Sequence, residues 1–200
     1  MSITNYTELK ATIADWLLRD DLTAVIPSFI ALTEADIARS VRHWLMERKV
    51  RTAIDEDYEF LPDDWLATIS LRHATGEEIK QIGVTDMADL AQRSATGKPA
   101  YFRHEAGRIE VYPAPDTGYD VDLVYYGRTP ALSDAAPTNW LLTNHPDILL
   151  YGSLLQSAPY LSDDAKVSTW GSLYSNAVQA LQRDSDAARF SGPLRMRIKT

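Results

Sequence analysis

Apolar residues recur every three or four positions near the start of the chain, which predicts two helices. The first is expected from about Thr7 to Leu18, with Thr7 as its N-cap. The second is expected from Pro27 to about Met46, because proline suits the first position of a helix. Its apolar stripe contains Ile26, Ile30, Ile37, Val41 and Trp44, with Phe29 and Leu45 beside it.

The pattern changes after Met46, where polar and apolar residues begin to alternate with the period of a β-strand. The expected strands are Lys49–Ile54, Tyr58–Leu61, Thr68–Arg72, Glu78–Ile82, Tyr101–His104, Ile109–Tyr112 and Tyr119–Tyr125. Residues Glu105–Arg108 are expected to form a hairpin turn in which Gly107 takes a positive φ. One short helix, Thr85–Ala91, is expected within this region.

Helical spacing returns in the last third of the chain. Thr143 or Asn144 is expected to cap a helix that starts at Pro146 and ends at Ala158, because Pro159 follows. A final helix is expected from Ser162 to about Ala188. Residues Pro62–Leu66 are expected to form a turn or a single helical turn. The acidic pairs Asp63–Asp64 and Asp163–Asp164 are interpreted as residues at helix starts, where negative charge is favourable.

These elements predict an α+β fold in which a β-rich, mainly antiparallel domain is inserted into a helical bundle. The bundle would comprise two N-terminal and two C-terminal helices, from residues 1–45 and 143–190. Residues 46–128 would form the β-rich domain, residues 129–142 a connecting arm and residues 191–200 a basic C-terminal tail.

Composition narrows the possible functions. The net charge of −8 argues against a protein that coats nucleic acid, which needs clustered Lys and Arg. The absence of cysteine excludes disulfides, thiolate metal sites and cysteine nucleophiles. The four histidines fall in four different elements, and Gly97–Lys98 lacks the rest of a phosphate-binding loop. We therefore expect no catalytic, metal or cofactor-binding residues and no enzyme activity.

Two features could instead mediate assembly. Trp140 lies in the arm, where it could be buried in its own subunit or could bind a neighbouring one, as aromatic residues do at interface centres. The chain after Asp186 has no acidic residue, so its end is either a solvated terminus or a docking arm for an acidic partner. The candidate interface residues are Trp140, Leu141, Arg189, Phe190, Arg195, Arg197 and Lys199.

The order of these segments resembles the head-to-tail adaptor proteins of short-tailed bacteriophages. The resemblance covers nearly the whole chain. It rests on Tyr6–Leu9 with Trp16–Leu17, Ile26–Glu34, Gly97–Pro99 before Tyr101, Val124–Tyr126 followed by Pro130–Ser133, Asn139–Leu142, Pro146–Leu161 and Arg189–Arg195. None of these pieces is diagnostic alone, because they are packing and turn residues, but their order is specific.

The resemblance implies a structural virion protein of the phage neck, assembled in the host cytoplasm. Its copies would form a homo-oligomeric ring, a dodecamer, that binds the portal protein and the tail nozzle or tail fibres. DNA would pass through the channel during genome ejection without sequence-specific binding. No cofactor and no membrane is implied.

Two other classes compete with this interpretation. A head-completion or neck protein of a long-tailed phage is also ring-forming, but the β-rich region is large for that class. A small hydrolase that uses scattered carboxylates is the second alternative, and the lack of any clustered site disfavours it.

Overall fold

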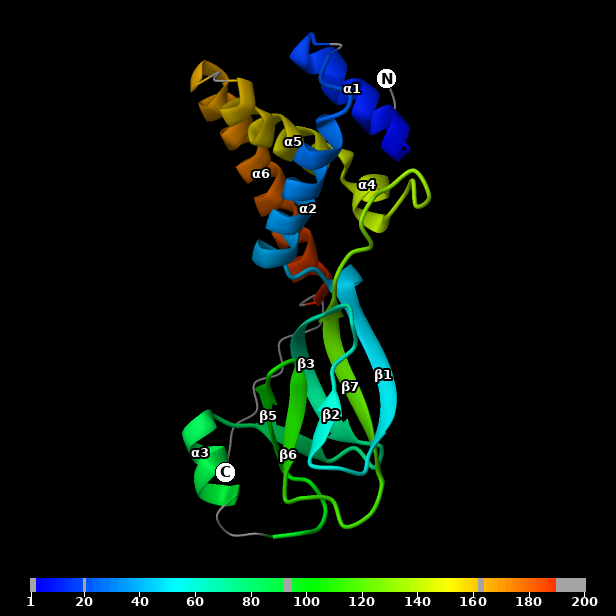
Figure 1. Cartoon of the computed structure of the whole chain (residues 1–200), viewed down its shortest axis with the longest axis vertical. Helices are drawn as coiled ribbons and strands as arrows, with labels where there is room; N and C mark the ends of the chain where they lie inside the picture. The colour runs from blue at the N-terminus through cyan, green and yellow to red at the C-terminus, as the bar shows by residue number, and fades with distance from the viewer. Residues whose placement is uncertain (1–2, 20, 92–94, 162–163, 190–200) are drawn as a thin grey trace. The chain divides into compact units, whose positions relative to one another are not determined.

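The computed structural model describes residues 3–19, 21–91, 95–161 and 164–189 (Figure 1). The chain forms two compact units. Unit 1 combines Met1–Leu45 with Thr129–Thr200, and unit 2 consists of Met46–Arg128. N-terminal helices pack with C-terminal ones, and a mostly antiparallel sheet lies between them in the sequence, so the predicted α+β class is confirmed.

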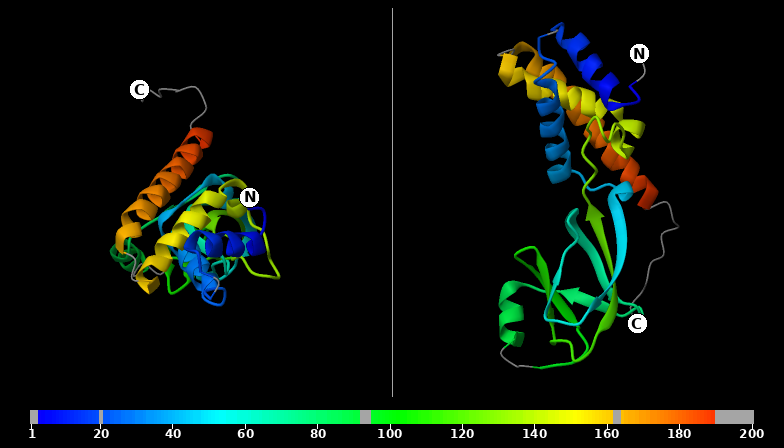
Figure 2. Two further views of the ribbon diagram at one scale, coloured as in Figure 1. Left: turned by 90° about the horizontal axis from the view of Figure 1, so that it is seen from above. Right: turned by 45° about the vertical axis from the view of Figure 1, so that its right-hand side comes forward.

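Unit 1 is helical (Figures 1 and 2). Its helices are α1 (Tyr6–Leu17), α2 (Ile26–Ser40), α4 (Trp140–Asn144), α5 (Pro146–Leu161) and α6 (Asp164–Arg189). Helix α5 contacts the other four, and its residues are buried on most sides because nearly all of them are apolar or small. The core of unit 1 therefore surrounds α5, with Ile13, Ile30, Leu142, Leu149 and Leu154 among its fully buried side chains.

Several helix ends differ from those expected. The N-cap of α1 is Asn5, whose Oδ1 accepts a hydrogen bond from the Glu8 backbone nitrogen at 2.9 Å, so Thr7 is inside the helix. Helix α2 ends at Ser40 instead of continuing to Met46, and the 3-10 helix η1 (Trp44–Met46) follows. Pro159 does not end α5, which continues to Leu161.

Helix α4 was not expected at all. Asn139 is its N-cap and accepts a hydrogen bond from the Leu142 backbone nitrogen at 2.9 Å. Trp140, expected in irregular backbone, is therefore the first residue of a short helix. Residues 162–163, which include part of the expected start of the last helix, lie outside the described residues.

Unit 2 is a seven-stranded sheet with the order β1-β7-β3-β4-β5-β6-β2. The strands are β1 (Glu47–Ile54), β2 (Tyr58–Phe60), β3 (Trp65–His73), β4 (Glu78–Gln81), β5 (Tyr101–Glu105), β6 (Arg108–Tyr112) and β7 (Tyr119–Gly127). Only β4 and β5 pair in parallel among the described strands, and α3 (Val84–Ala91) connects them. The sheet has its own core, which includes Ile54, Leu71, Phe102, Val121 and Leu123.

The hairpin between β5 and β6 has the expected register, with Glu105 opposite Arg108. Ala106 and Gly107 both have positive φ, at 47° and 78°, as the central residues of a type I′ turn require. This prediction is confirmed.

The interpretation of Asp63–Asp64 as helix-start residues is wrong. Both lie in a turn before β3. The Asp64 carboxylate accepts a hydrogen bond from the Tyr125 hydroxyl at 2.9 Å and forms an ion pair with Arg48 at 2.8 Å. The acidic group thus joins β1, β3 and β7 rather than capping a helix.

Candidate assembly surfaces

The arm, residues 129–142, packs on the helices of its own unit. The carboxylate of Glu34 on α2 accepts a hydrogen bond from the Leu132 backbone nitrogen at 2.9 Å, and burial raises the pKa of Glu34 above its usual range. The Tyr6 backbone nitrogen donates to the Pro137 carbonyl at 2.8 Å. Because these bonds use the backbone, they position the arm whatever side chains it presents.

Trp140 adds a side-chain contact between the two ends of the arm. Its indole Nε1 donates a hydrogen bond to the Thr129 hydroxyl at 3.0 Å. Its ring stacks on the imidazole of His43, with 5.1 Å between ring centroids and 15° between ring planes. The ring is half-buried, so part of it is accessible to a neighbouring molecule.

His43 is a fully buried ionisable residue of unit 1. Its Nδ1 accepts a hydrogen bond from the Leu45 backbone nitrogen at 3.2 Å. Its Nε2 lies 3.6 Å from a carboxylate oxygen of Asp184 and has no hydrogen-bond partner among the described residues. Burial lowers the pKa of His43, and the charges of His145 and Arg189 lower it further, while Asp184 opposes the shift.

The structure therefore brings two of the candidate interface residues near one imidazole. Trp140 stacks on His43, and Arg189, the last residue of α6, acts on its charge. Leu141 is only 1% exposed and belongs to the core of unit 1. Phe190, Arg195, Arg197 and Lys199 lie outside the described residues. The interface role of all seven stays a prediction.

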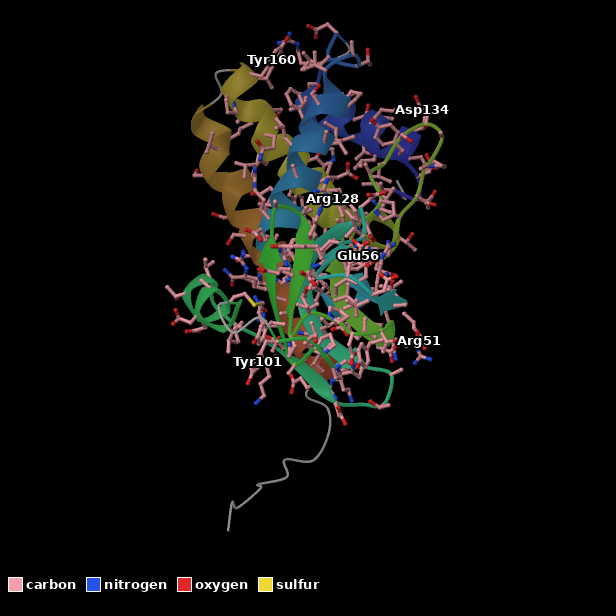
Figure 3. The ribbon with its side chains drawn as sticks, turned by 60° about the horizontal axis from the view of Figure 1, so that its bottom comes forward. Arg51, Glu56, Tyr101, Arg128, Asp134 and Tyr160 are labelled. Carbon is pink, nitrogen blue, oxygen red and sulfur yellow. The ribbon has the colours of Figure 1, made fainter. Side chains whose placement is uncertain are left out.

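Unit 1 also presents large apolar side chains to solvent. Leu18, directly after α1, is 87% exposed, and Tyr160 in the last turn of α5 is 59% exposed (Figure 3). The Tyr160 ring lies 5.8 Å from that of Phe29 in the first turns of α2, so Tyr160 covers the start of that helix. Trp16 and Leu32 are each about half exposed. Where such side chains adjoin, they are candidates for contact with another protein.

Unit 2 has an apolar hollow between β1 and β2. The hollow has a volume of about 160 Å³, and its lining includes Val50, Thr52 and Ile54 of β1 and Phe60 and Leu61 at β2. The two strands stand at opposite ends of the sheet order and do not pair with each other, although they are consecutive in the chain. Both strands contribute lining residues, and each has one unpaired edge in the sheet order, so we call this space the β1–β2 hollow.

Charged residues flank the lining residues of β1 along the chain. The loop that joins β1 to β2 contains three consecutive exposed acidic residues, Asp55, Glu56 and Asp57. No ion pair joins these three to a basic side chain within the described part of the chain. On β1, Lys49 and Arg51 both form ion pairs with Asp122 of β7, which hold the pKa of that carboxyl well below its usual range.

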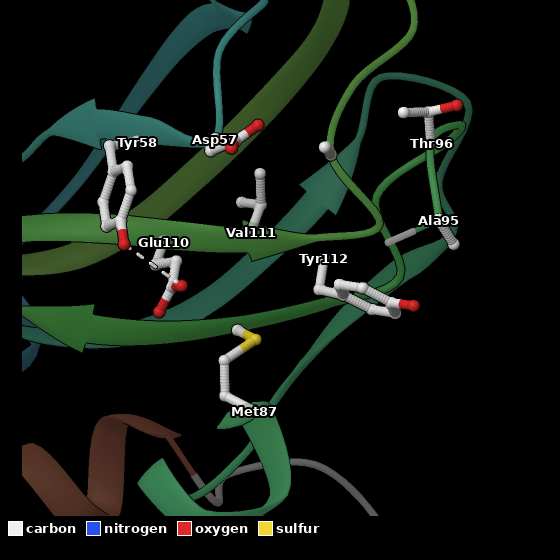
Figure 4. A pocket seen from close by; sticks show the side chains of 9 residues that line it. Asp57, Tyr58, Met87, Ala95, Thr96, Glu110, Val111 and Tyr112 are labelled. Carbon is white, nitrogen blue, oxygen red and sulfur yellow. Dashed lines mark hydrogen bonds between the residues drawn. The ribbon is translucent and has the colours of Figure 1, made fainter. Parts of the chain in front are cut away.

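A second pocket of unit 2, of about 340 Å³, lies beside α3 (Figure 4). Two acidic residues, Asp57 and Glu110, line it. Glu110 accepts a hydrogen bond from Tyr58 at 3.2 Å and pairs with Arg103. Met87, Val111 and Tyr112 form much of the remaining wall. We find no arrangement of nucleophile and base among these residues.

The described residues contain no group of three His, Cys, Asp or Glu side chains that could hold a metal ion. No helix within the described ranges is both long and apolar enough to span a membrane.

Comparison with known protein families identifies the family of this chain. The family model of the SU10 adaptor protein matches residues 4–197, which is nearly the whole chain. The chain belongs to the SU10 adaptor protein family. This is a family of phage head-to-tail adaptors, which are structural proteins and not enzymes. No curated protein matches the chain. The resemblance found from the sequence motifs is thereby confirmed.

Proposed function

We propose that this SU10-family adaptor forms a ring of twelve copies between the portal and the tail nozzle or tail fibres of a phage. The observation that carries the proposal is the family match over residues 4–197. A ring requires heterologous contacts, in which one surface of a subunit binds a different surface of the next. The two units of the chain offer surfaces of different chemistry for such contacts.

The helical unit supplies the apolar surface in this proposal. Leu18 and Tyr160 project from the ends of α1 and α5, and burying them would provide the hydrophobic free energy that a subunit contact needs. The half-buried face of Trp140 and the charge of Arg189 are assigned to the same role. The tail residues Phe190, Arg195, Arg197 and Lys199 are assigned to contacts with the portal or a neighbouring copy.

The acidic character of the chain supports a role around a DNA channel. With a net charge of −8, the walls of such a channel would repel phosphate and allow the genome to pass without binding. Genome ejection that is unchanged after neutralising the acidic residues facing the channel would contradict this part of the proposal.

The first experiment is the native mass of the purified protein, alone and mixed with the portal of the same phage. We expect a small species when the protein is alone and a closed, symmetric ring when the portal is present. The ring should contain about twelve copies, the number that the family resemblance implies. A chain that remains small and separate in the presence of the portal would overturn the proposal.

A variant tests the apolar surface of unit 1. Leu18→Asn removes an 87% exposed apolar side chain and suits the positive φ of 52° at this position, so the fold should be preserved. We expect it to weaken ring assembly. Val84→Asn in α3, which removes a 66% exposed apolar residue from unit 2, is the matched control. Equal assembly of the two variants would exclude Leu18 from the contact.

A further inference from the structure

The β1–β2 hollow has the properties of a site for an extended peptide. Its walls are mostly apolar, and it is lined by β1 and β2, the two strands with an unpaired edge in the sheet order. A strand edge offers backbone donors and acceptors to an added segment, and adjacent pockets take its alternate side chains. Apolar cavities of about 150 Å³ can hold a molecule the size of benzene, so a hollow of about 160 Å³ has room for an aliphatic side chain.

The hollow has a buried floor and an accessible rim. Ile54, Leu71 and Val121 of its lining are buried and belong to the core of unit 2. At the rim, Val50 is 37% exposed and Phe60 is 69% exposed. Val50, Thr52 and Ile54 share one face of β1 because they are two residues apart. An added segment that covers this face would remove apolar surface from water, which is favourable.

The end of the chain has the complementary pattern. Residues 194–199 read Leu-Arg-Met-Arg-Ile-Lys, which is a strict alternation of apolar and basic residues. In an extended conformation Leu194, Met196 and Ile198 would share one face, and Arg195, Arg197 and Lys199 would share the other. Six extended residues span about 20 Å, comparable with the ~26 Å of the eight-residue β1.

The charge also fits. Asp55, Glu56 and Asp57 directly follow Ile54, the last lining residue of β1. No basic side chain of the described residues pairs with them. Unit 2 as a whole contains sixteen acidic and ten basic residues, whereas residues 190–200 contain three basic residues and no acidic one. A basic segment is therefore attracted to unit 2, and its orientation is set by the acidic loop.

We propose that residues 194–199 of one copy bind in the β1–β2 hollow of a neighbouring copy. Leu194, Met196 and Ile198 share the face that is turned to the hollow; one of them enters it, and the others cover the exposed rim. The basic side chains face outward, where the nearest can pair with Asp55, Glu56 or Asp57. This inference rests on the proposed ring, since a segment of one subunit bound in the next is a heterologous contact that a ring can repeat at every interface.

The chain has no cysteine, so disulfide formation can test the contact without background. Val50→Cys and Met196→Cys are prepared as two separate single-cysteine chains, and one of them carries a size tag. The two are mixed, assembled on the portal and oxidised. We expect a covalent product that contains one chain of each size, because a disulfide forms only when the two Cα atoms lie within about 7 Å.

Two controls define the result. Val84→Cys replaces Val50→Cys on an exposed part of α3, outside the hollow, and should give a mixed product at least tenfold less abundant. Arg197→Cys replaces Met196→Cys on the opposite face of the segment and should also reduce the product, since alternate residues face opposite ways. Equal yields in all three mixtures would overturn the proposed docking.

The remaining outcomes separate this inference from the ring itself. A ring of normal mass without the mixed product overturns the docking and leaves the proposed function intact. A chain with both Val50→Cys and Met196→Cys that closes only on itself, while the mixture gives no product, overturns the assignment to a neighbouring copy. The absence of any ring on the portal overturns the proposed function first.

Discussion

The buried imidazole of His43 makes the stability of unit 1 depend on pH. His43 is fully buried beside Trp140, and burial lowers its pKa, so the native state favours the neutral ring. Its Nδ1 accepts a hydrogen bond from the Leu45 backbone, which assigns the remaining proton to Nε2. Protonation would place a second positive charge near Arg189 in a buried environment. The free energy needed to do so lowers the stability of the protonated native state.

We therefore predict that unit 1 loses stability as the pH falls from 7 to 5. The unfolded chain binds a proton on His43 near pH 6.5 whereas the native state resists it, so stability is complete above that pH and declines below it. The contribution of His43 to the slope is at most about 1.4 kcal/mol per pH unit. Urea unfolding followed by tryptophan fluorescence at several pH values measures it.

The control is His43→Asn, which keeps an acceptor near the Leu45 nitrogen but cannot be protonated. This variant should be less stable at pH 7 and should have a shallower pH dependence than the parent chain. An unchanged slope would show that His43 does not determine it. His104, whose pKa burial also lowers, contributes a residual slope from unit 2 that both proteins share.

The sequence identifies Trp140 as a large aromatic residue of the arm, but it does not predict that Trp140 contacts His43. His43 is 97 positions earlier, and its residue type suggests only a possible metal ligand. Nothing in either local pattern encodes the stacking, because it depends on how the arm packs against the end of α2. Caps are similarly ambiguous: Asn5 and Thr7 are both good N-caps, and packing selected Asn5.

At the scale of elements, helices α2 and α6 both pack closely against α5 at Gly152. A Cβ atom at this position would lie 2.3 Å from Cγ2 of Thr33 on α2 and 3.0 Å from the Tyr174 ring on α6. Thr33 is fully buried and its hydroxyl donates to the Phe29 carbonyl at 3.0 Å, so it cannot move aside freely. The three helices can pack this closely only because residue 152 has no side chain.

We predict that Gly152→Ala destabilises unit 1 by about 1–3 kcal/mol, the usual cost of overpacking a core. Gly171→Ala in α6 is the matched control, since its nearest neighbour would be a Leu155 methyl at an ordinary 3.8 Å. The control should be neutral or stabilising by up to about 1 kcal/mol, because alanine is the better helix former. Chemical denaturation of both variants gives the comparison, and equal stabilities would refute the packing argument.

Elements with strong periodicity were predictable from the sequence, and those fixed by tertiary contacts were not. The alternation of β1 and β7 and the type I′ hairpin turn are local signals, and all three are present. Helix α4 is five residues long and has no periodic pattern, so only the cap at Asn139 could have indicated it. Asp64 was misinterpreted because its partners, Arg48 and Tyr125, come from distant strands.

At the scale of the whole molecule, each unit has its own hydrophobic core. The buried apolar residues of unit 2 all come from within Met46–Arg128, and unit 1 closes around α5 from both ends of the chain. The chain passes between the units only twice, after Leu45 and after Arg128. The alternation of polar and apolar residues predicts strands in this region. The hollow that β1 and β2 line depends instead on the order of the strands in the sheet, which is a long-range property.

This organisation predicts that unit 2 folds alone. A fragment of residues 46–128 contains all seven strands and their shared core, so it should show a β-rich circular dichroism spectrum and a cooperative urea transition. Gly152→Ala in the full chain should then shift the transition of unit 1 and leave that of unit 2 at the midpoint of the fragment, since distant sites act independently. A fragment without a cooperative transition, or a single transition that Gly152→Ala shifts as a whole, would show that the two units are stable only together.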